Sequence, residues 1–189
     1  MNTPMPGHRA PSASFEVPLE MLAACHLRIE SQCDTLQRLA EHLLQHGCDE
    51  QARSAAAGVM RYFDTAALQH HADEESDLFP ALLESMAGSD AVCLRELTQS
   101  LTQDHRALTL QWRALRTPLS RLAEGGEAVL PEDAVRAFAD AYRAHLERED
   151  GELLPMATRL LDDSALEQIG RAMRERRGIA PPDTTDLPG

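Results

Sequence analysis

A segment of 20 residues occurs twice in this chain, and the two copies align without a gap. The first, residues 61–80, reads RYFDTAALQHHADEESDLFP, and the second, residues 136–155, reads RAFADAYRAHLEREDGELLP. Each copy contains a histidine and a glutamate four residues apart and ends on a proline. Because residues at this spacing lie on one face of a helix, the repeat predicts two equivalent helical units that pack against each other.

The whole chain is predicted to be helical. Only 4% of the residues are aromatic, and Ala, Leu, Glu, Gln and Arg fill the periodic segments, which favours helix over strand. Glycines and helix-capping residues divide the chain into long helices at about 17–46, 50–85, 90–123 and 131–161, and a short one at about 164–177. Short connections indicate antiparallel neighbours. We therefore expect an all-α, antiparallel, up-down-up-down four-helix bundle with a short fifth C-terminal helix.

The length and composition predict one domain with two tails. A chain of 189 residues with 43% hydrophobic content is typical of a single globular domain, which we place at residues 17–177. Residues 1–16 lack the apolar segment of a signal peptide and are predicted to be a disordered tail on a cytoplasmic protein. Residues 178–189 are predicted to be a disordered C-terminal tail. No segment approaches the roughly 20 apolar residues that a membrane span requires.

Charge and motif content exclude several classes of function. The net charge of -13 argues against nucleic acid and against an anionic membrane as partners, because both would repel the protein. The four cysteines have no C-x-x-C spacing that would indicate structural zinc. The chain also lacks a glycine-rich phosphate-binding motif and a recognisable nucleophile motif.

Two single histidines lie in apolar stripes outside the repeat. Around His26 and around His105, apolar residues recur every three or four positions, so both imidazoles are expected to face the core. In the repeats, Phe63 and Phe138 place the histidine and glutamate in the same inward register. An unpaired buried polar group costs about 1–3 kcal/mol, so a core with this many polar groups predicts a bound cation. The candidate ligands are His26, His70, Glu74, His105, His145 and Glu149.

A second register in the first repeat has the same internal spacing. His71 and Glu75 are also four residues apart, but this register places the charged Asp64 two turns before the histidine. We therefore assign His70 and Glu74 and keep His71 and Glu75 as alternates.

The order of these residues resembles the hemerythrin-like HHE cation-binding family over about residues 17–161. The shared pattern is a histidine, then His-x-x-x-Glu, repeated once, with Leu-Phe-Pro or Leu-Leu-Pro after each pair. The resemblance implies a non-haem di-iron centre, with two Fe ions bridged by carboxylates and an oxo or hydroxo group. It further implies four terminal histidine ligands and two bridging carboxylates, namely His26, His70, His105, His145, Glu74 and Glu149.

The chain departs from the oxygen carriers of that family. These have a fifth histidine one turn after the third-helix histidine, where this chain has Thr109, so one iron is expected to have an open position there. They also use an aspartate five residues after the last histidine as a bridge. Asp150 occupies that place beside Glu149, so the second bridge is open, and we prefer Glu149 because Glu74 has the same spacing. Glu30, four residues after His26, is a further candidate, although a surface carboxylate is the better interpretation.

An open position on reducible iron favours reaction with O2, nitric oxide or peroxide. The family that the chain resembles includes oxygen carriers, sensing modules and proteins linked to nitrosative stress and iron–sulfur cluster repair. We expect a protein that binds or senses a small diatomic ligand, O2 or nitric oxide. The alternatives are an oxidoreductase that acts on O2, peroxide or nitric oxide in oxidative or nitrosative stress, and a protein of iron handling.

Overall fold

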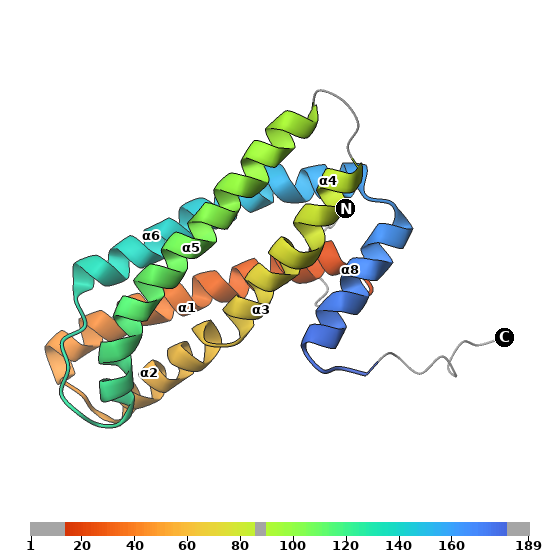
Figure 1. Ribbon diagram of the computed structural model, residues 1–189. Coiled ribbons are helices and arrows are strands. Elements are labelled where there is room, and N and C mark those ends of the chain that lie inside the picture. The colour runs from red at the N-terminus through yellow and green to blue at the C-terminus, as the bar shows by residue number, and fades with distance from the viewer. Residues whose placement is uncertain (1–13, 86–89, 181–189) are drawn as a thin grey trace, which may run out of the picture.

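A computed structural model of the chain describes residues 14–85 and 90–180. Its long helices are α1 (Pro18–His46), α2 (Glu50–Phe63), α5 (Asp90–Ala123) and α6 (Glu132–Arg148), and they run antiparallel to their neighbours in a bundle (Figure 1). The predicted fold class is confirmed. Residues 1–13 and 181–189, which make up most of the predicted tails, and residues 86–89 before α5 lie outside the described ranges.

The helices close a ring around the bundle axis. α1 packs against α2 and α6, and α5 packs against the same two helices on the opposite side. The short helix α8 (Asp163–Arg176) contacts α1 and α3 (Ala66–Asp73), and in Figure 1 it crosses one end of the bundle. The repeat of the sequence thus becomes two helices that face each other across the axis.

The second and fourth long helices are segmented, where the sequence predicted continuous helices. Each contains a π-helical segment, η1 (Glu74–Leu78) or η2 (Glu149–Leu153), which leads into α4 (Phe79–Ser85) or α7 (Leu154–Leu160). In η1 the Phe79 N–H donates to the Glu74 carbonyl, and in η2 the Leu154 N–H donates to the Glu149 carbonyl.

The prolines of the repeat explain these π turns. Pro80 and Pro155 are the second residues after the two π segments and have no N–H to donate to the carbonyl four residues before them. A wider turn before each proline removes the steric conflict with that carbonyl. π turns inside α-helices are frequent at functional sites, and here each one begins at a glutamate of the repeat.

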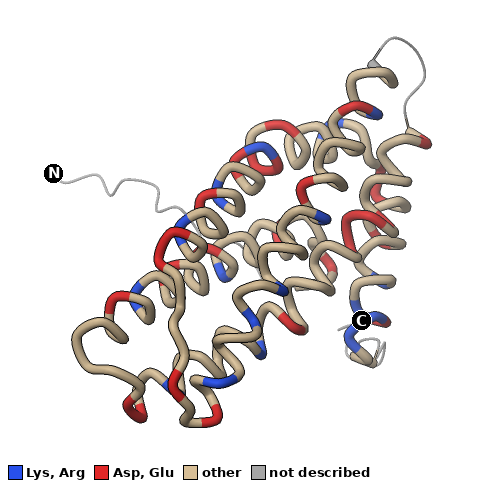
Figure 2. Tube along the Cα trace, turned by 60° about the vertical axis from the view of Figure 1, so that its left-hand side comes forward, with Lys and Arg blue, Asp and Glu red and all other residues tan. Residues whose placement is uncertain are grey.

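The apolar core consists of two clusters. One lies between the halves of α1, α2, α5 and α6 that hold Ile29, Phe63, Trp112 and Phe138. The other includes residues of α1, α4, α5, α7 and α8. Charged residues of both signs are spread along the helices, as Figure 2 shows. Within the described chain the buried acidic residues are Asp73, Glu74 and Glu149, and the two glutamates lie with buried histidines between the two clusters.

No helix within the described ranges is long and apolar enough to cross a membrane.

A substitution at Gly170 in α8 tests how tightly this helix packs against the end of the bundle. A Cβ atom on Gly170 would lie 2.0 Å from the backbone carbonyl oxygen of Phe15, which leaves no room for a side chain. We expect Gly170→Ala to lower the free energy of unfolding by about 1–3 kcal/mol. Gly58, in α2, is the matched control because a Cβ there meets nothing within 4 Å. Gly58→Ala should raise stability by about 0.5–1 kcal/mol in the same urea titration. Equal effects of the two substitutions would contradict the tight contact at Gly170.

Candidate metal centre

Six buried side chains from four helices meet in the layer between the two apolar clusters. α1 provides His26, α5 provides His105, and the two repeats provide His70 with Glu74 and His145 with Glu149. None of the six is more than 3% exposed. These six residues form two overlapping sets of four, and in each set every residue has a ligand atom within 4.8 Å of the ligand atoms of the other three. One set is His26, His70, Glu74 and Glu149, and the other is His105, His145, Glu74 and Glu149.

The two carboxylates face both sets of histidines at once. Glu74 has one oxygen 3.4 Å from His70 Nε2 and the other oxygen 3.3 Å from His105 Nε2. Glu149 has one oxygen 3.3 Å from His26 Nε2 and the other 3.1 Å from His145 Nε2. Each carboxylate therefore spans the layer and presents one oxygen to each half.

The spacing and bonding of these atoms fit a cation site. Adjacent donors around an octahedral cation at about 2.1 Å are about 3 Å apart, which is close to the measured separations. Within the described chain, both oxygens of Glu74, both oxygens of Glu149 and both ring nitrogens of His70 lack a hydrogen-bond partner. Buried polar atoms are normally paired, so these unpaired donor atoms fit a bound cation.

Two further carboxylates orient the single histidines. Glu75, the residue after Glu74, has an oxygen 2.6 Å from His105 Nδ1. Asp150, the residue after Glu149, has an oxygen 2.7 Å from His26 Nδ1. Both contacts are to the ring nitrogen that faces away from the cluster. A carboxylate at this place fixes the ring and makes the opposite nitrogen a better metal ligand.

Charge pairs anchor the two helices beside the cluster. Asp73, which precedes Glu74, is fully buried and forms ion pairs with Arg176, the last residue of α8, and with Arg177, the residue after it. Arg148, which precedes Glu149, pairs with Asp104 at 2.9 Å. Each glutamate of the cluster is thus held by a salt bridge on the adjacent residue.

His71 lies at the edge of the cluster and is 7% exposed. Its ring stacks on His105 at 3.9 Å between centroids, with an angle of 12° between the planes. One ring nitrogen of His71 lies within 4.8 Å of nitrogens of His105 and His145. The parallel rings argue against a shared ion, because a ligating nitrogen directs its lone pair in the plane of its ring. His71 Nε2 instead lies 3.4 Å from the Tyr142 hydroxyl.

The other candidates from the sequence lie outside the cluster. Glu30 is exposed on α1. The Thr109 hydroxyl donates to the carbonyl of His105 at 2.8 Å, as is typical of threonine within a helix.

Protonation balances the charge of the buried glutamates. Burial alone would lower the pKa of His26, but its contacts with three carboxylates, first that of Asp150, raise it to about 12. Burial would also lower the pKa of His105, but its contacts with Glu149 and Glu74 raise this pKa to about 10. Burial would raise the pKa of Glu74, yet the neighbouring histidines hold it at about 2. Without cations, two protonated histidines neutralise two carboxylates.

Sequence reasoning missed the contacts around the cluster. The acidic residue after each glutamate of the repeat was visible as Glu75 and Asp150, but its contact with a histidine on another helix was not. The contact of Tyr142 with His71 had no signal in the repeat, because the equivalent of Tyr142 is Ala67.

The fold and this layer define a four-helix bundle protein with a buried His/Glu cluster suited to a metal. The Hemerythrin HHE cation binding domain family matches residues 17–157, and the chain belongs to this family. A curated relative from Haemophilus influenzae, described as an uncharacterized protein, is 29% identical over 167 residues. The match covers 88% of this chain and 94% of the relative. The predicted family is confirmed.

Cation binding is expected to release protons. At pH 7 His26 and His105 carry protons that a metal must displace, so loading should release about two protons per chain, and affinity should rise about tenfold per proton with each pH unit. Without metal, the stability from these raised pKa values is complete below the ordinary histidine pKa of 6.5 and is lost as pH rises through about 10 to 12. A pH indicator in weakly buffered solution measures the release. His26→Gln should release about one proton fewer, and loading without proton release would contradict the assignment.

The carboxylates of Glu75 and Asp150 should strengthen metal binding from outside the cluster. We expect Glu75→Gln and Asp150→Asn each to weaken metal affinity by about 10–100-fold, because the amide supports the histidine less strongly. Glu152→Gln is the control, since Glu152 is an exposed carboxylate of the same π segment as Asp150. Competition with a chelator gives the affinities, and an equal loss in the control would show a general charge effect.

Proposed function

We propose that this protein holds two iron ions and binds or senses O2 or nitric oxide at them. His26 and His70 would hold one ion, and His105 and His145 the other. Glu74 and Glu149 would bridge the pair. Iron in such a site supplies a reducible centre to which small diatomic ligands bind.

The orientation of the two carboxylates carries this proposal. A glutamate that served one cation would direct its oxygens to one group of histidines. Glu74 and Glu149 each place one oxygen near the His26/His70 side and one near the His105/His145 side. Two cations side by side satisfy this arrangement, because each then receives two imidazole nitrogens and two carboxylate oxygens.

The donor set is compatible with iron. Four imidazoles and two carboxylates form a nitrogen and oxygen site that suits a first-row transition metal. The described cysteines are absent from the candidate metal groups, so the thiolate pairs that favour structural zinc are missing from them. Two carboxylates also offset part of the charge of two divalent cations.

Metal analysis of anaerobically purified protein tests the centre directly. We expect two irons per chain in the wild type, a strong loss of iron in His70→Ala, and full retention in His71→Ala. The two histidines are adjacent and both buried, so the pair separates ligation from general damage to the helix. Near-zero iron or a single zinc per chain would refute the di-iron centre, and loss only in His71→Ala would place the ligand one residue later.

Absorption spectra of the reduced protein then test the role. A long-lived spectrum after addition of O2 or nitric oxide would support binding or sensing. Rapid return to the ferric spectrum with consumption of the added gas would instead show turnover. Iron that exchanges readily with chelators and responds to neither gas would indicate iron handling.

A further inference from the structure

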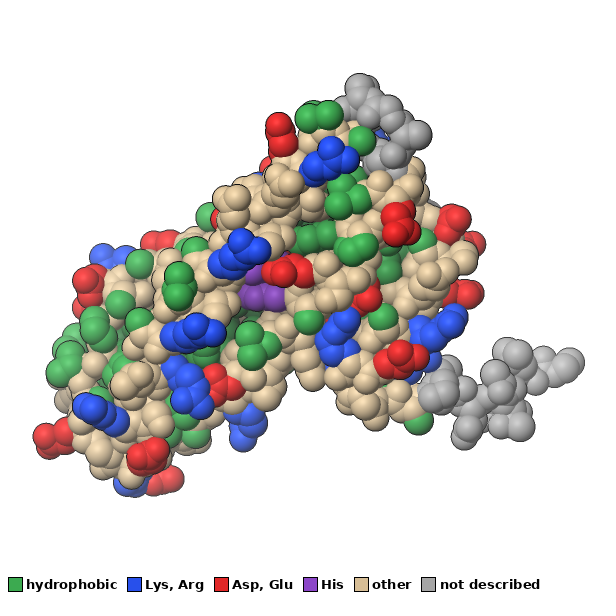
Figure 3. All heavy atoms as spheres, viewed as in Figure 1, with side chains coloured by type: hydrophobic (Ala, Val, Ile, Leu, Met, Phe, Trp, Pro, Cys, Tyr) green, Lys and Arg blue, Asp and Glu red, His purple; other side chains and the backbone are tan. Residues whose placement is uncertain are grey.

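A pocket of about 520 Å³ lies between α3 and α5 and reaches the candidate metal centre. Thr109, Arg106 and Arg113 of α5 line it, together with the buried side chains of His71 and His105. Figure 3 shows histidine side chains at the surface in the depression between these helices. An external molecule in this α3/α5 pocket can therefore approach the His105 side of the cluster.

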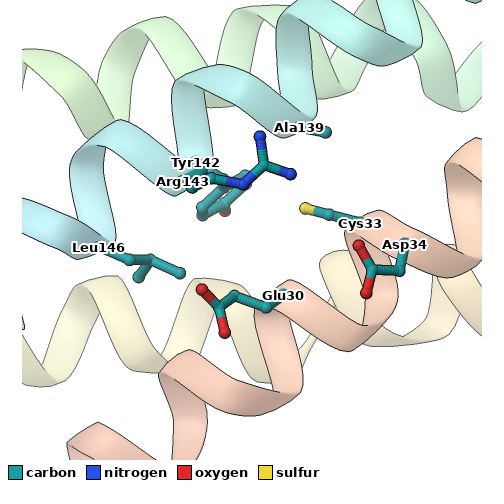
Figure 4. A pocket seen from close by; sticks show the side chains of 7 residues that line it. All are labelled: Glu30, Cys33, Asp34, Ala139, Tyr142, Arg143 and Leu146. Atoms are coloured by element: carbon teal, nitrogen blue, oxygen red, sulfur yellow. The ribbon is translucent and has the colours of Figure 1, made fainter.

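A smaller pocket of about 210 Å³ lies at the symmetry-related place between α1 and α6 (Figure 4). The repeat and the correspondence of His26 with His105 relate four lining positions of the two pockets. These pairs are Glu30 with Thr109, Asp34 with Arg113, Arg143 with Leu68, and Leu146 with His71.

The two pockets differ in what separates them from the cluster. In the α1/α6 pocket the buried, apolar Leu146 stands where the other pocket has His71. Its lining includes Tyr142 and Cys33 but none of the six residues of the cluster. The α3/α5 pocket, in contrast, is lined by His105 itself. Of these two routes, only the α3/α5 pocket leads to a candidate ligand.

The two pockets also differ in charge. Arg106 and Arg113 line the α3/α5 pocket, and its one carboxylate, Glu75, is engaged with His105. The α1/α6 pocket has two carboxylates, Glu30 and Asp34, and one arginine, Arg143, so acidic groups outnumber basic ones there. On a protein with a net charge of -13, a site with two arginines is a local attraction for anions.

The place beside Thr109 is short of protein donors. The Thr109 hydroxyl is directed to the carbonyl of its own helix, and the stacked ring of His71 is parallel to that of His105. Neither group adds a ligand next to His105 in this arrangement. The α3/α5 pocket therefore reaches the His105/His145 site on the side where the protein provides no further ligand.

We propose that small anions enter through the α3/α5 pocket and bind the ion held by His105 and His145, in the space beside Thr109. The inference rests on the proposed di-iron centre and adds to it a route, a choice between the two ions and a preference for negative charge. His71 forms the wall over the bound anion and takes the place of the leucine that closes the other pocket.

Azide binding to the iron-loaded protein, followed by absorption, tests the route. We expect Thr109→Phe to fill the pocket and to weaken azide binding by at least about tenfold, with two irons per chain retained. The matched control is Glu30→Phe at the equivalent position of the α1/α6 pocket, which should change azide affinity by less than about twofold. Equal effects of the two substitutions, or a larger effect of Glu30→Phe, would overturn the route.

A second pair of variants tests the charge preference and does not depend on the fold of Thr109→Phe. Arg113→Ala should slow azide association by about three- to tenfold at low salt, and added salt should reduce this difference. Asp34→Ala is its counterpart in the other pocket and should not slow azide. Binding of nitric oxide, which is uncharged, should be the same in both variants. If Arg113→Ala left azide association unchanged, the proposed entry of anions would be wrong.

Iron content separates this inference from the proposed function. If the wild type bound fewer than two irons, the di-iron centre would fail. If two irons and azide were bound but the Thr109 and Arg113 variants behaved like their controls, only the route would fail.

Discussion

Glu74 and Glu149 are fully buried side by side in the middle of the bundle, and two negative charges in that position repel each other at low dielectric. The rest of the structure around them follows from the need to neutralise this pair. Each glutamate lies next to histidines from three helices, so any cation or proton that compensates the charge must be held by several helices at once. The cluster therefore depends on how the helices pack together and cannot be formed by one helix alone.

This constraint explains how the surrounding parts are arranged. A buried polar layer costs folding free energy, and the apolar clusters on both sides supply the hydrophobic contribution that offsets it. The π turns begin at the two glutamates, and the salt bridges of Asp73 and Arg148 fix the residues just before them. Local distortion and charge pairing are thus concentrated where the carboxylates must keep their orientation.

Much of the fold and of the cluster could be predicted because both depend on periodic patterns along one helix. The gap-free repeat indicated the register of His70 and Glu74, and the apolar stripes placed His26 and His105 on inner faces. The features that could not be predicted depend on contacts between helices. The repeat contains Pro80 and Pro155, yet the π turn that precedes each proline is a response of the packed helix. The resemblance to the oxygen carriers made Asp150 a candidate bridge, whereas its contact with His26 depends on the distance between α1 and the fourth long helix.

The two halves of the cluster are similar in their inner residues and different in their outer ones. His26 and His105 each have a carboxylate on the far nitrogen, and each glutamate faces both sides, so the inner residues keep the symmetry of the repeat. Outside them, His71 stands opposite Leu146, and Thr109 opposite Glu30. Bridging carboxylates restrict the inner positions because they must reach two sites at fixed spacing, whereas the outer positions have no such restriction. Differences between the two sides can therefore arise in the outer residues without loss of the shared carboxylates. On one side the pocket is lined by His105, whereas on the other side Leu146 separates the pocket from the cluster.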